Sequence, residues 1–413
     1  MLRQDFTIRS LLGVTTRNEI IKFSLGRNIS EYEKSLEPYS KSITDNNFVI
    51  KSIVKKIIHS KTIYCAETPE EYFALKKITH DIKRLYKIRT QNRDDICEQV
   101  LRLLEATSRY GIIKIDIKSF YESIDYKSVL SKLDKDKLLS AKSISLLKNL
   151  IGLNIVGLPR GLSISPVLSE IFMRDIDTKI KGISGVFYYS RYVDDIFVLT
   201  TKEHALIFSE IQKIFSKEKI QVNKKTFKCD IPEAHLNKNK KIAFDYLGYK
   251  YNITNEIYKN KRSITITLSD DKIRKLKTRI IHSLLDRCNG SEDLSERKNL
   301  LYKRINILSG NYPIMSRKGR DGSLKGGIYY SNRLVNKSGI FKEINSFLNK
   351  CIFSKSNNSF GRGMKSIPLD EKLKICEISF REGFLNRKYI DLSSEEMLKI
   401  KKCWMHKNHK KRS

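Results

Sequence analysis

Val186-Phe-Tyr-Tyr-Ser-Arg-Tyr-Val-Asp-Asp-Ile-Phe-Val-Leu-Thr200 is the stretch of sequence that decides the fold. Two runs rich in aromatic and β-branched residues flank Asp194 and Asp195, which predicts two strands joined by a tight acidic turn. Adjacent carboxylates repel each other, and a divalent metal ion is well suited to offset that repulsion. Taken alone, the pair is more simply a solvated turn, so its meaning depends on the rest of the chain.

The composition indicates a folded protein with a polyanionic partner. Hydrophobic residues make up 40% of the 413 residues, enough for a core spread over two or three subdomains. Lys and Arg number 80 against 46 acidic residues, and nucleic acid is the partner that best fits the formal charge of +34. No apolar run reaches the roughly 18 residues of a membrane span, and the N-terminus resembles no secretory signal. We therefore expect a cytoplasmic protein that does not associate with membranes.

The first 70 residues carry apolar side chains at helical spacing, including Val49–Ile58, which predicts a helical N-terminal extension. Thr68-Pro69 has the residue types of a helix start. From residue 76 onward, seven cations fall within eighteen residues: Lys76, Lys77, Lys83, Arg84, Lys87, Arg89 and Arg93. We interpret this segment as a short β-ribbon with one basic face that binds a triphosphate or a template backbone. A solvated charged face is the alternative.

A second acidic position lies upstream, in the segment Gly111–Asp125. Its Ile-rich first half predicts a strand that ends at Asp116, and Ser119 begins a helical turn. A carboxylate at a strand end is a suitable place for a metal ligand.

Between the two acidic positions lies a bend, Gly157-Leu-Pro-Arg-Gly-Leu-Ser-Ile-Ser-Pro166, followed by a predicted helix to Ile180. Arg160 lies on the bend, and Gly161 would let the backbone approach a ligand closely. Downstream, residues 241–253 predict a hairpin that turns at Gly248, and the pattern is helical from Asp270 onward.

Three of these features together resemble the motifs of reverse transcriptases. Asp116 with Phe120-Tyr121 resembles their first catalytic motif, Leu158–Pro166 the second, and Tyr192-Val-Asp-Asp195 the signature motif. Further likenesses are the basic turn at Lys225, the primer-grip hairpin at Tyr246, Leu247 and Gly248, and the fingers segment of bacterial enzymes related to group II introns at Arg84–Arg93. The resemblance runs from about residue 70 to residue 265.

The resemblance implies an α+β fold of the right-hand polymerase type, with fingers, a palm built on an antiparallel sheet, and a thumb. On this basis residues 1–70 are the helical extension, residues 71–265 the fingers and palm, and residues 266–413 the helical thumb and C-terminal region. The implied activity is RNA-directed DNA synthesis from dNTPs, with an RNA template and a DNA product as partners.

The resemblance also implies roles for individual residues. Asp116, Asp194 and Asp195 are the expected catalytic residues, and with Ile117 they are the expected positions for two Mg²⁺ ions, or Mn²⁺, held about 3.5–4 Å apart. We expect Asp194 to matter more than Asp195. The expected dNTP contacts are Lys77, Arg84, Tyr121, Arg160, Gly161 and Lys225. The Tyr121 ring would exclude a ribose 2′-hydroxyl, although plain core packing is the alternative for this residue.

Several departures from the common pattern indicate a particular branch of the family. Arg160 stands where many reverse transcriptases have Gln, and the Val-Thr-Gly and Asn-Ala-x-x-His motifs usual in retron enzymes are missing. Residues 308–313 and 327–333 resemble bacterial enzymes of the defence-associated, abortive-infection group. This resemblance implies antiphage defence with a noncoding RNA as template. A second copy of the chain or another defence protein is then a further candidate partner.

Three alternatives stay open. The first is a retron or group II-like enzyme, which a branched RNA–DNA hybrid would reveal. The second is an untemplated or protein-primed polymerase, for which the 20 Tyr residues offer hydroxyls. The third is a catalytically silent nucleic-acid-binding scaffold, although such a scaffold has no need of three acidic positions.

Overall fold

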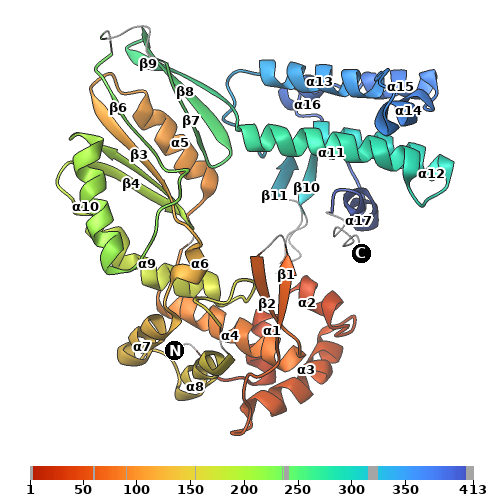
Figure 1. Cartoon of the computed structure of the whole chain (residues 1–413). Coiled ribbons are helices and arrows are strands. Elements are labelled where there is room, and N and C mark those ends of the chain that lie inside the picture. Colours follow the sequence, from red (N-terminus) through yellow and green to blue (C-terminus); the bar gives the residue numbers. More distant parts are fainter. Residues whose placement is uncertain are drawn as a thin grey trace. The chain divides into compact units, whose positions relative to one another are not determined.

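The computed structural model describes residues 3–58, 61–89, 91–153, 155–234, 236, 241–314 and 324–405. The chain forms two compact units, which Figure 1 shows in sequence colours. The first unit comprises Met1–Ile96 and Ser108–Glu233, and the second comprises Cys97–Thr107 and Ala234–Ser413. The described strands all pair antiparallel within their sheets, which confirms the predicted α+β class. The domain boundaries at residues 70 and 265 stay a prediction.

The N-terminal part of the first unit combines three helices with a hairpin: α1 (Ile8–Val14), α2 (Arg17–Lys22), α3 (Ile29–Thr44), β1 (Ile53–Ile58) and β2 (Lys61–Ala66). The prediction of an entirely helical extension is therefore wrong at the hairpin. The apolar spacing of β1 also suits a helix, but its β-branched residues favour a strand once a partner is present. The pairing with β2, from Ile53 opposite Ala66 to Ile58 opposite Lys61, decides the outcome.

Helix α4 (Pro69–Leu85) begins as predicted, with Thr68 accepting a hydrogen bond from the Glu71 N–H and Pro69 in the first turn. The basic segment that follows is not the predicted β-ribbon, because the same helix continues through it to Leu85. The reason is the helical spacing of Leu75, Ile78 and Ile82, which are all buried in the core of the unit.

A four-stranded sheet with the order β4-β5-β3-β6 lies at the centre of the first unit. Its strands are β3 (Tyr110–Asp116), β4 (Val186–Tyr192), β5 (Asp195–Thr200) and β6 (Phe227–Ile231). Helices α9 (Ser165–Lys181) and α10 (His204–Lys217) contact it (Figure 1). The apolar side chains of Ile113, Ile115, Ile196 and Val198 join their core. The short helices α6 (Phe120–Ser123), α7 (Tyr126–Asp136), α8 (Ala141–Asn149) and η1 (Leu150–Leu153) connect β3 to the bend before α9.

The second unit contains a three-stranded sheet of β7 (Lys241–Tyr246), β8 (Tyr249–Tyr258) and β9 (Lys261–Leu268), together with the C-terminal part of helix α5 (Arg93–Leu104). Arg262 of β9 is almost fully buried and satisfies carbonyl groups just beyond that helix. Its Nε donates to the Ala106 oxygen at 3.0 Å, and its main-chain N–H donates to the Glu105 oxygen at 2.9 Å. An arginine at a helix C-terminus also complements the helix dipole.

The remainder of the second unit is mainly helical, as expected, with one short pair of strands. The elements are α11 (Asp270–Asn289), α12 (Leu294–Ser309), β10 (Asn311–Ile314), β11 (Leu324–Gly327), α13 (Gly339–Ile352), α14 (Ser359–Lys365), α15 (Leu369–Cys376), α16 (Phe380–Leu385) and α17 (Ser394–Lys402). Buried Asn311 ties this region together, because its side chain donates to the Gly383 oxygen at 3.2 Å and accepts from the Tyr329 N–H at 2.8 Å.

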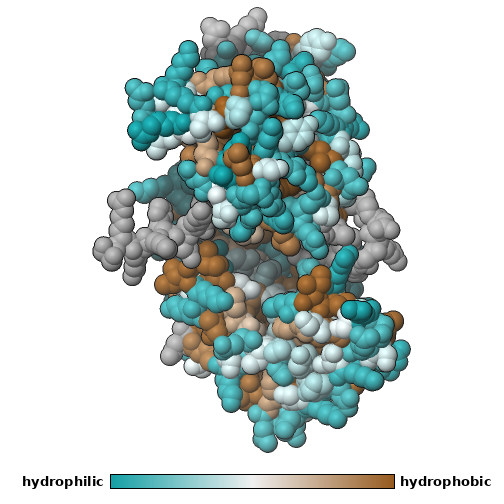
Figure 2. All heavy atoms as spheres, turned by 90° about the vertical axis from the view of Figure 1, so that its right-hand side faces the viewer, coloured by the Kyte–Doolittle hydropathy of each residue, from teal (hydrophilic) through white to brown (hydrophobic). Residues whose placement is uncertain are grey.

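The surface carries both hydrophilic and hydrophobic residues (Figure 2). On the face shown in Figure 2, hydrophilic residues predominate and hydrophobic residues form separate patches. Among the described residues, no helix is both long enough and apolar enough to cross a membrane.

Candidate active site

The register of the central sheet brings two of the predicted acidic positions together. Strands β3 and β5 pair so that Asp116 lies directly opposite Asp195. Directly opposed residues of an antiparallel pair point to the same face of the sheet, with neighbouring Cβ atoms. Strand β4 adds Tyr192 opposite Asp195 on the other side. The two sequence motifs therefore meet at one end of the sheet.

The third carboxylate lies in the turn between β4 and β5. Pairing of Tyr192 with Asp195 leaves Val193 and Asp194 as the turn residues. Val193 has a φ of +58°, a conformation that a β-branched residue rarely adopts and that costs on the order of 1–3 kcal/mol. The Asp194 main-chain oxygen accepts from the Ile117 N–H at 3.2 Å. This bond places the Ile117 main chain, a predicted metal position, beside the turn.

The carboxylates are poorly solvated and repel one another. Burial raises the pKa of Asp194, and the charge of Asp116 raises it further. Burial raises the pKa of Asp195 to about 6, with Asp194 adding to the rise and Lys114 and Lys225 opposing it. Among the described residues, no three His, Cys, Asp or Glu side chains are grouped as a ready metal site. The desolvated, mutually repelling oxygens are nevertheless the donor type that Mg²⁺ prefers.

The Gly-Leu-Pro-Arg-Gly bend lies against the first acidic motif. The Leu158 N–H donates to the Tyr121 oxygen at 2.8 Å. Arg160 pairs with Glu122 through two hydrogen bonds of 3.1 Å each, and its guanidinium carbon lies 5.3 Å from the centre of the Tyr121 ring. Burial raises the pKa of Tyr121, and the nearby charge of Asp194 adds to the rise. The structure thus brings all three motifs together, with Arg160 engaged by Glu122.

The structure explains the glycine at position 161 by a contact within the chain, whereas the sequence predicted the approach of a ligand. Its φ is +102°, and a Cβ atom there would lie 2.5 Å from a methyl carbon of Ile63 and 2.6 Å from the Tyr64 oxygen. In addition, the Tyr64 N–H donates to the Arg160 oxygen at 2.7 Å. The close approach that requires glycine is therefore made by strand β2 of this chain.

Of the other cationic side chains predicted to contact the dNTP, one is buried and two are exposed. Lys77 is buried in α4, where its ammonium group binds Asp81 and donates to the Arg3 oxygen at 2.7 Å. This placement corrects its predicted role at a triphosphate, because the charge is already paired in the core. Arg84 is exposed at the end of α4, and Lys225 is exposed on the turn before β6, close enough to influence Asp195.

The predicted primer grip belongs to the second unit. Tyr246 and Tyr249 pair as the last residues of β7 and the first of β8, so that Leu247 and Gly248 form the turn. Both turn residues have positive φ, +44° and +81°, as a tight hairpin turn of this kind requires. The turn itself is as predicted, and its role as a primer grip stays a prediction.

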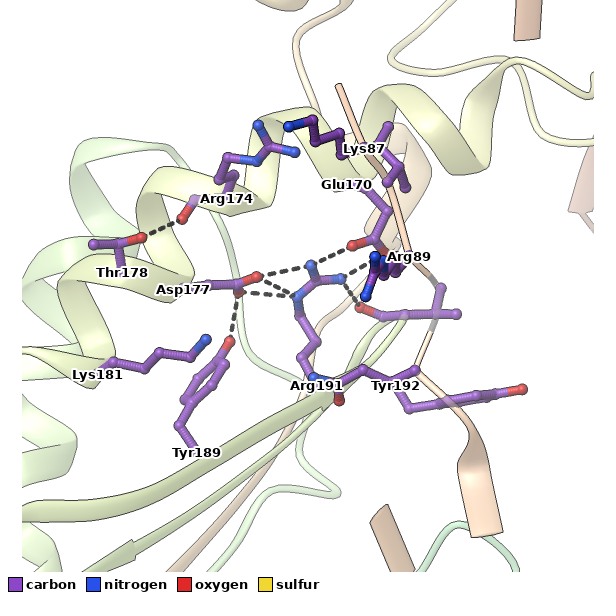
Figure 3. A pocket seen from close by; sticks show the side chains of 13 residues that line it. Lys87, Arg89, Glu170, Arg174, Asp177, Thr178, Lys181, Tyr189, Arg191 and Tyr192 are labelled. Atoms are coloured by element: carbon purple, nitrogen blue, oxygen red, sulfur yellow. Dashed lines mark hydrogen bonds and ion pairs between the residues drawn. The ribbon is translucent and has the colours of Figure 1, made fainter. Parts of the chain in front are cut away.

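Sequence reasoning missed Arg191, which the structure shows buried behind the turn (Figure 3). Its guanidinium donates to Asp177 at 2.9 and 2.8 Å, to Glu170 at 3.0 and 2.8 Å, and to the Val193 main-chain oxygen at 3.1 Å. The Tyr189 hydroxyl also donates to Asp177, at 2.6 Å. The available signal was an arginine within a strand that is otherwise rich in aromatic residues.

Comparison with known proteins agrees with this geometry. Residues 53–251 match the family described as reverse transcriptase (RNA-dependent DNA polymerase), so the chain contains a reverse transcriptase domain over just under half of its length. The predicted resemblance is confirmed to that extent. A search of curated proteins found no match.

Similar solved structures include two yeast telomerases. Telomerase from Candida albicans in complex with a TWJ fragment of telomeric RNA has 13% identity and a TM-score of 0.31, over 82% of this chain and 56% of that one. Apo telomerase from Candida tropicalis has 13% identity and a TM-score of 0.33, over 80% and 55%. The chain therefore spans little more than half the length of these structures.

The raised pKa of Asp195 predicts a pH-dependent cost to stability in metal-free protein. The folded-state pKa of about 6 exceeds the ordinary 3.8, so ionisation destabilises the fold increasingly between about pH 4 and pH 6 and fully above that. Asp195→Asn should therefore raise the free energy of unfolding by about 1–2 kcal/mol at pH 7.5 and by almost nothing at pH 4. Urea denaturation in EDTA measures this difference. Exposed Asp175→Asn is the control, and an equal gain at both pH values would contradict the prediction.

Proposed function

We propose that the chain is an RNA-directed DNA polymerase that extends a primer with dNTPs. The observation that carries the proposal is the register that sets Asp116 opposite Asp195, beside a turn that presents Asp194. The reverse transcriptase domain at residues 53–251 supports the same activity. A scaffold without catalysis would gain nothing from a set of desolvated carboxylates that destabilise one another.

Asp116, Asp194 and Asp195 are the side chains that would hold the divalent ions, either Mg²⁺ or Mn²⁺. Such ions, when bound, lower the pKa of the primer hydroxyl and neutralise the leaving pyrophosphate. The chain's own contribution is to keep the carboxylates adjacent and partly shielded from water, and this burial raises the pKa of Asp194 and of Asp195. The Ile117 N–H holds the Asp194 main chain in place through its hydrogen bond.

Three side chains are candidates for contact with the incoming nucleotide, two through their positive charge and one through its bulk. Exposed Lys225 and Arg84 are the proposed triphosphate contacts. Tyr121 is the proposed barrier to a ribose 2′-hydroxyl, because its half-buried ring lies beside the Asp194 charge and under Arg160. The ion pair with Glu122 holds Arg160 along this ring, where it can border the incoming base pair.

Replacement of the two adjacent carboxylates by alanine tests the catalytic proposal. Asp194→Ala with Asp195→Ala should abolish dNTP incorporation on an RNA template, since the oxygen ligands are lost. Binding of the same RNA should change less than twofold, because that affinity depends on cations. Primer extension and fluorescence anisotropy measure the two effects. If the double variant still incorporates dNTPs, the catalytic proposal is wrong. Single substitutions should show the larger loss at Asp194.

Tyr121→Ala tests sugar selection. Opening the space under the sugar should raise the ratio of NTP to dNTP incorporation at least tenfold, whereas Tyr121→Phe should keep the wild-type ratio. Single-nucleotide extension with matched dNTP and NTP pairs gives the ratio. If Tyr121→Ala only lowers the melting temperature and leaves the ratio unchanged, the ring serves core packing.

We further propose that the polymerase serves bacterial antiphage defence with a noncoding RNA as its template. The support is the likeness of Arg160 and of residues 308–313 and 327–333 to defence-associated enzymes. Sequencing of nucleic acids that copurify with the chain tests it, and one recurrent noncoding RNA with its DNA copy is the expected result. A branched RNA–DNA hybrid would instead indicate a retron, and DNA bound covalently to a Tyr residue a protein-primed polymerase.

A further inference from the structure

A pocket of about 560 Å³ lies beside the catalytic turn, between the segment after α4, helix α9 and strand β4 (Figure 3). This volume falls within the range of about 300–1,000 Å³ that is usual for ligand sites. Strand β4 is an edge strand, so the pocket lies at the border of the sheet. Val193 is among its lining residues, and the pocket therefore reaches the turn that presents Asp194.

The charge around this pocket is not balanced by the protein. Four exposed cations line it, from two different elements: Lys87, Arg89, Arg174 and Lys181. None of them forms an ion pair within the part of the chain that the structure describes. The two carboxylates of the pocket, Glu170 and Asp177, are both bound by Arg191. Arg174 donates to the Tyr86 main-chain oxygen at 2.7 Å, and the Lys181 ammonium lies 5.4 Å from the centre of the Tyr189 ring, but neither contact neutralises the positive charge. The surplus of positive charge therefore favours an anionic ligand.

We propose that this pocket binds a segment of single-stranded nucleic acid. Long cationic side chains spread around a rim suit the successive phosphates of a strand better than one compact anion. Half-buried Tyr192 adds an aromatic surface on which a base can stack. The inference rests on the proposed function, since a polymerase must hold a strand away from its reacting end as well as at it.

Replacement of all four cations by Gln tests this site. The affinity for a single-stranded RNA or DNA oligonucleotide should fall at least tenfold, and the slope of log K against log salt should fall by about 0.7 for each cation removed. The matched control replaces four exposed lysines that lie outside the pocket, on α7 and α10: Lys127, Lys135, Lys213 and Lys217.

Each result of this comparison is decisive. A loss confined to the pocket variant supports the site, whereas an equal loss in the control shows diffuse attraction to a basic surface and overturns it. Unchanged binding in both variants overturns it as well. Wild-type primer extension is measured in parallel. If the wild-type chain extends no primer, the proposed polymerase function is contradicted. The oligonucleotide affinities of the two variants would still show whether the pocket binds nucleic acid.

The acidic turn is held from behind by the buried side chain of Arg191. Val193 has an unfavourable positive φ, and its carbonyl oxygen accepts a hydrogen bond from Arg191. Arg191 in turn is held by two carboxylates of helix α9, Glu170 and Asp177. From this geometry we infer that Arg191 is a positioning residue, which fixes the turn and therefore Asp194 relative to α9. Lysine cannot replace it, because an ammonium lacks the planar fork that reaches both carboxylates and the carbonyl.

Arg191→Lys tests this inference against Asp81→Asn, which breaks a buried ion pair in α4 away from the turn. Both variants should lose stability, since each disrupts a buried pair. Arg191→Lys alone should lower kcat for incorporation at least tenfold, with the KM for dNTP within twofold of wild type. It alone should also speed amide hydrogen exchange at Asp194 and Asp195 at least tenfold at a temperature where both variants stay folded.

Hydrogen exchange that is accelerated equally in both variants, or in neither, would show that Arg191 only stabilises the fold. A kcat that falls in step with stability in both variants leads to the same conclusion. Because exchange needs no activity, this readout remains decisive even if the wild-type chain incorporates no nucleotide.

Discussion

The candidate active site of the first unit requires like charges to lie close together, beside a turn whose backbone conformation is itself unfavourable. Asp116 and Asp195 oppose each other across two strands, while Val193 takes a conformation that β-branched residues avoid. Such an arrangement persists only where the surroundings outweigh its cost. Here the apolar packing of the sheet against α9 and α10, and the buried contacts of Arg191, supply that compensation.

Much of this site was predictable because its signals are local. Strand periodicity located Asp116 at the end of one strand, as observed, and the acidic pair at a turn between two others. The observed turn lies one residue earlier, at Val193 and Asp194, because Asp195 pairs with Tyr192 as the first residue of β5. The hairpin turn at Gly248 and the start of α4 at Thr68 were predictable for the same reason, since turn and cap residues act on their immediate neighbours.

The errors arose where a distant partner decides the outcome. Lys77 pairs with Asp81 four residues later on the same helix, a contact that the predicted β-ribbon would not make, and only the fold shows that the pair is buried and that the distant Arg3 carbonyl also binds Lys77. The β1–β2 hairpin has an apolar spacing that also fits a helix, and pairing between the strands settles the choice. Arg191 went unnoticed because its partners, Glu170 and Asp177, lie on a helix that the sequence gives no reason to place behind the turn.

The glycine at position 161 has a consequence for how the sequence can vary. Gly161 is exposed, and exposed positions usually tolerate many residues. Its positive φ and its contact with β2 nevertheless leave no room for a single additional carbon atom. The β1–β2 hairpin and the bend before α9 are thus in direct contact at this position, where the Tyr64 N–H also donates to the Arg160 oxygen. Any side chain at position 161 would therefore force the hairpin and the bend apart, which makes this exposed position as sterically restricted as one in the core.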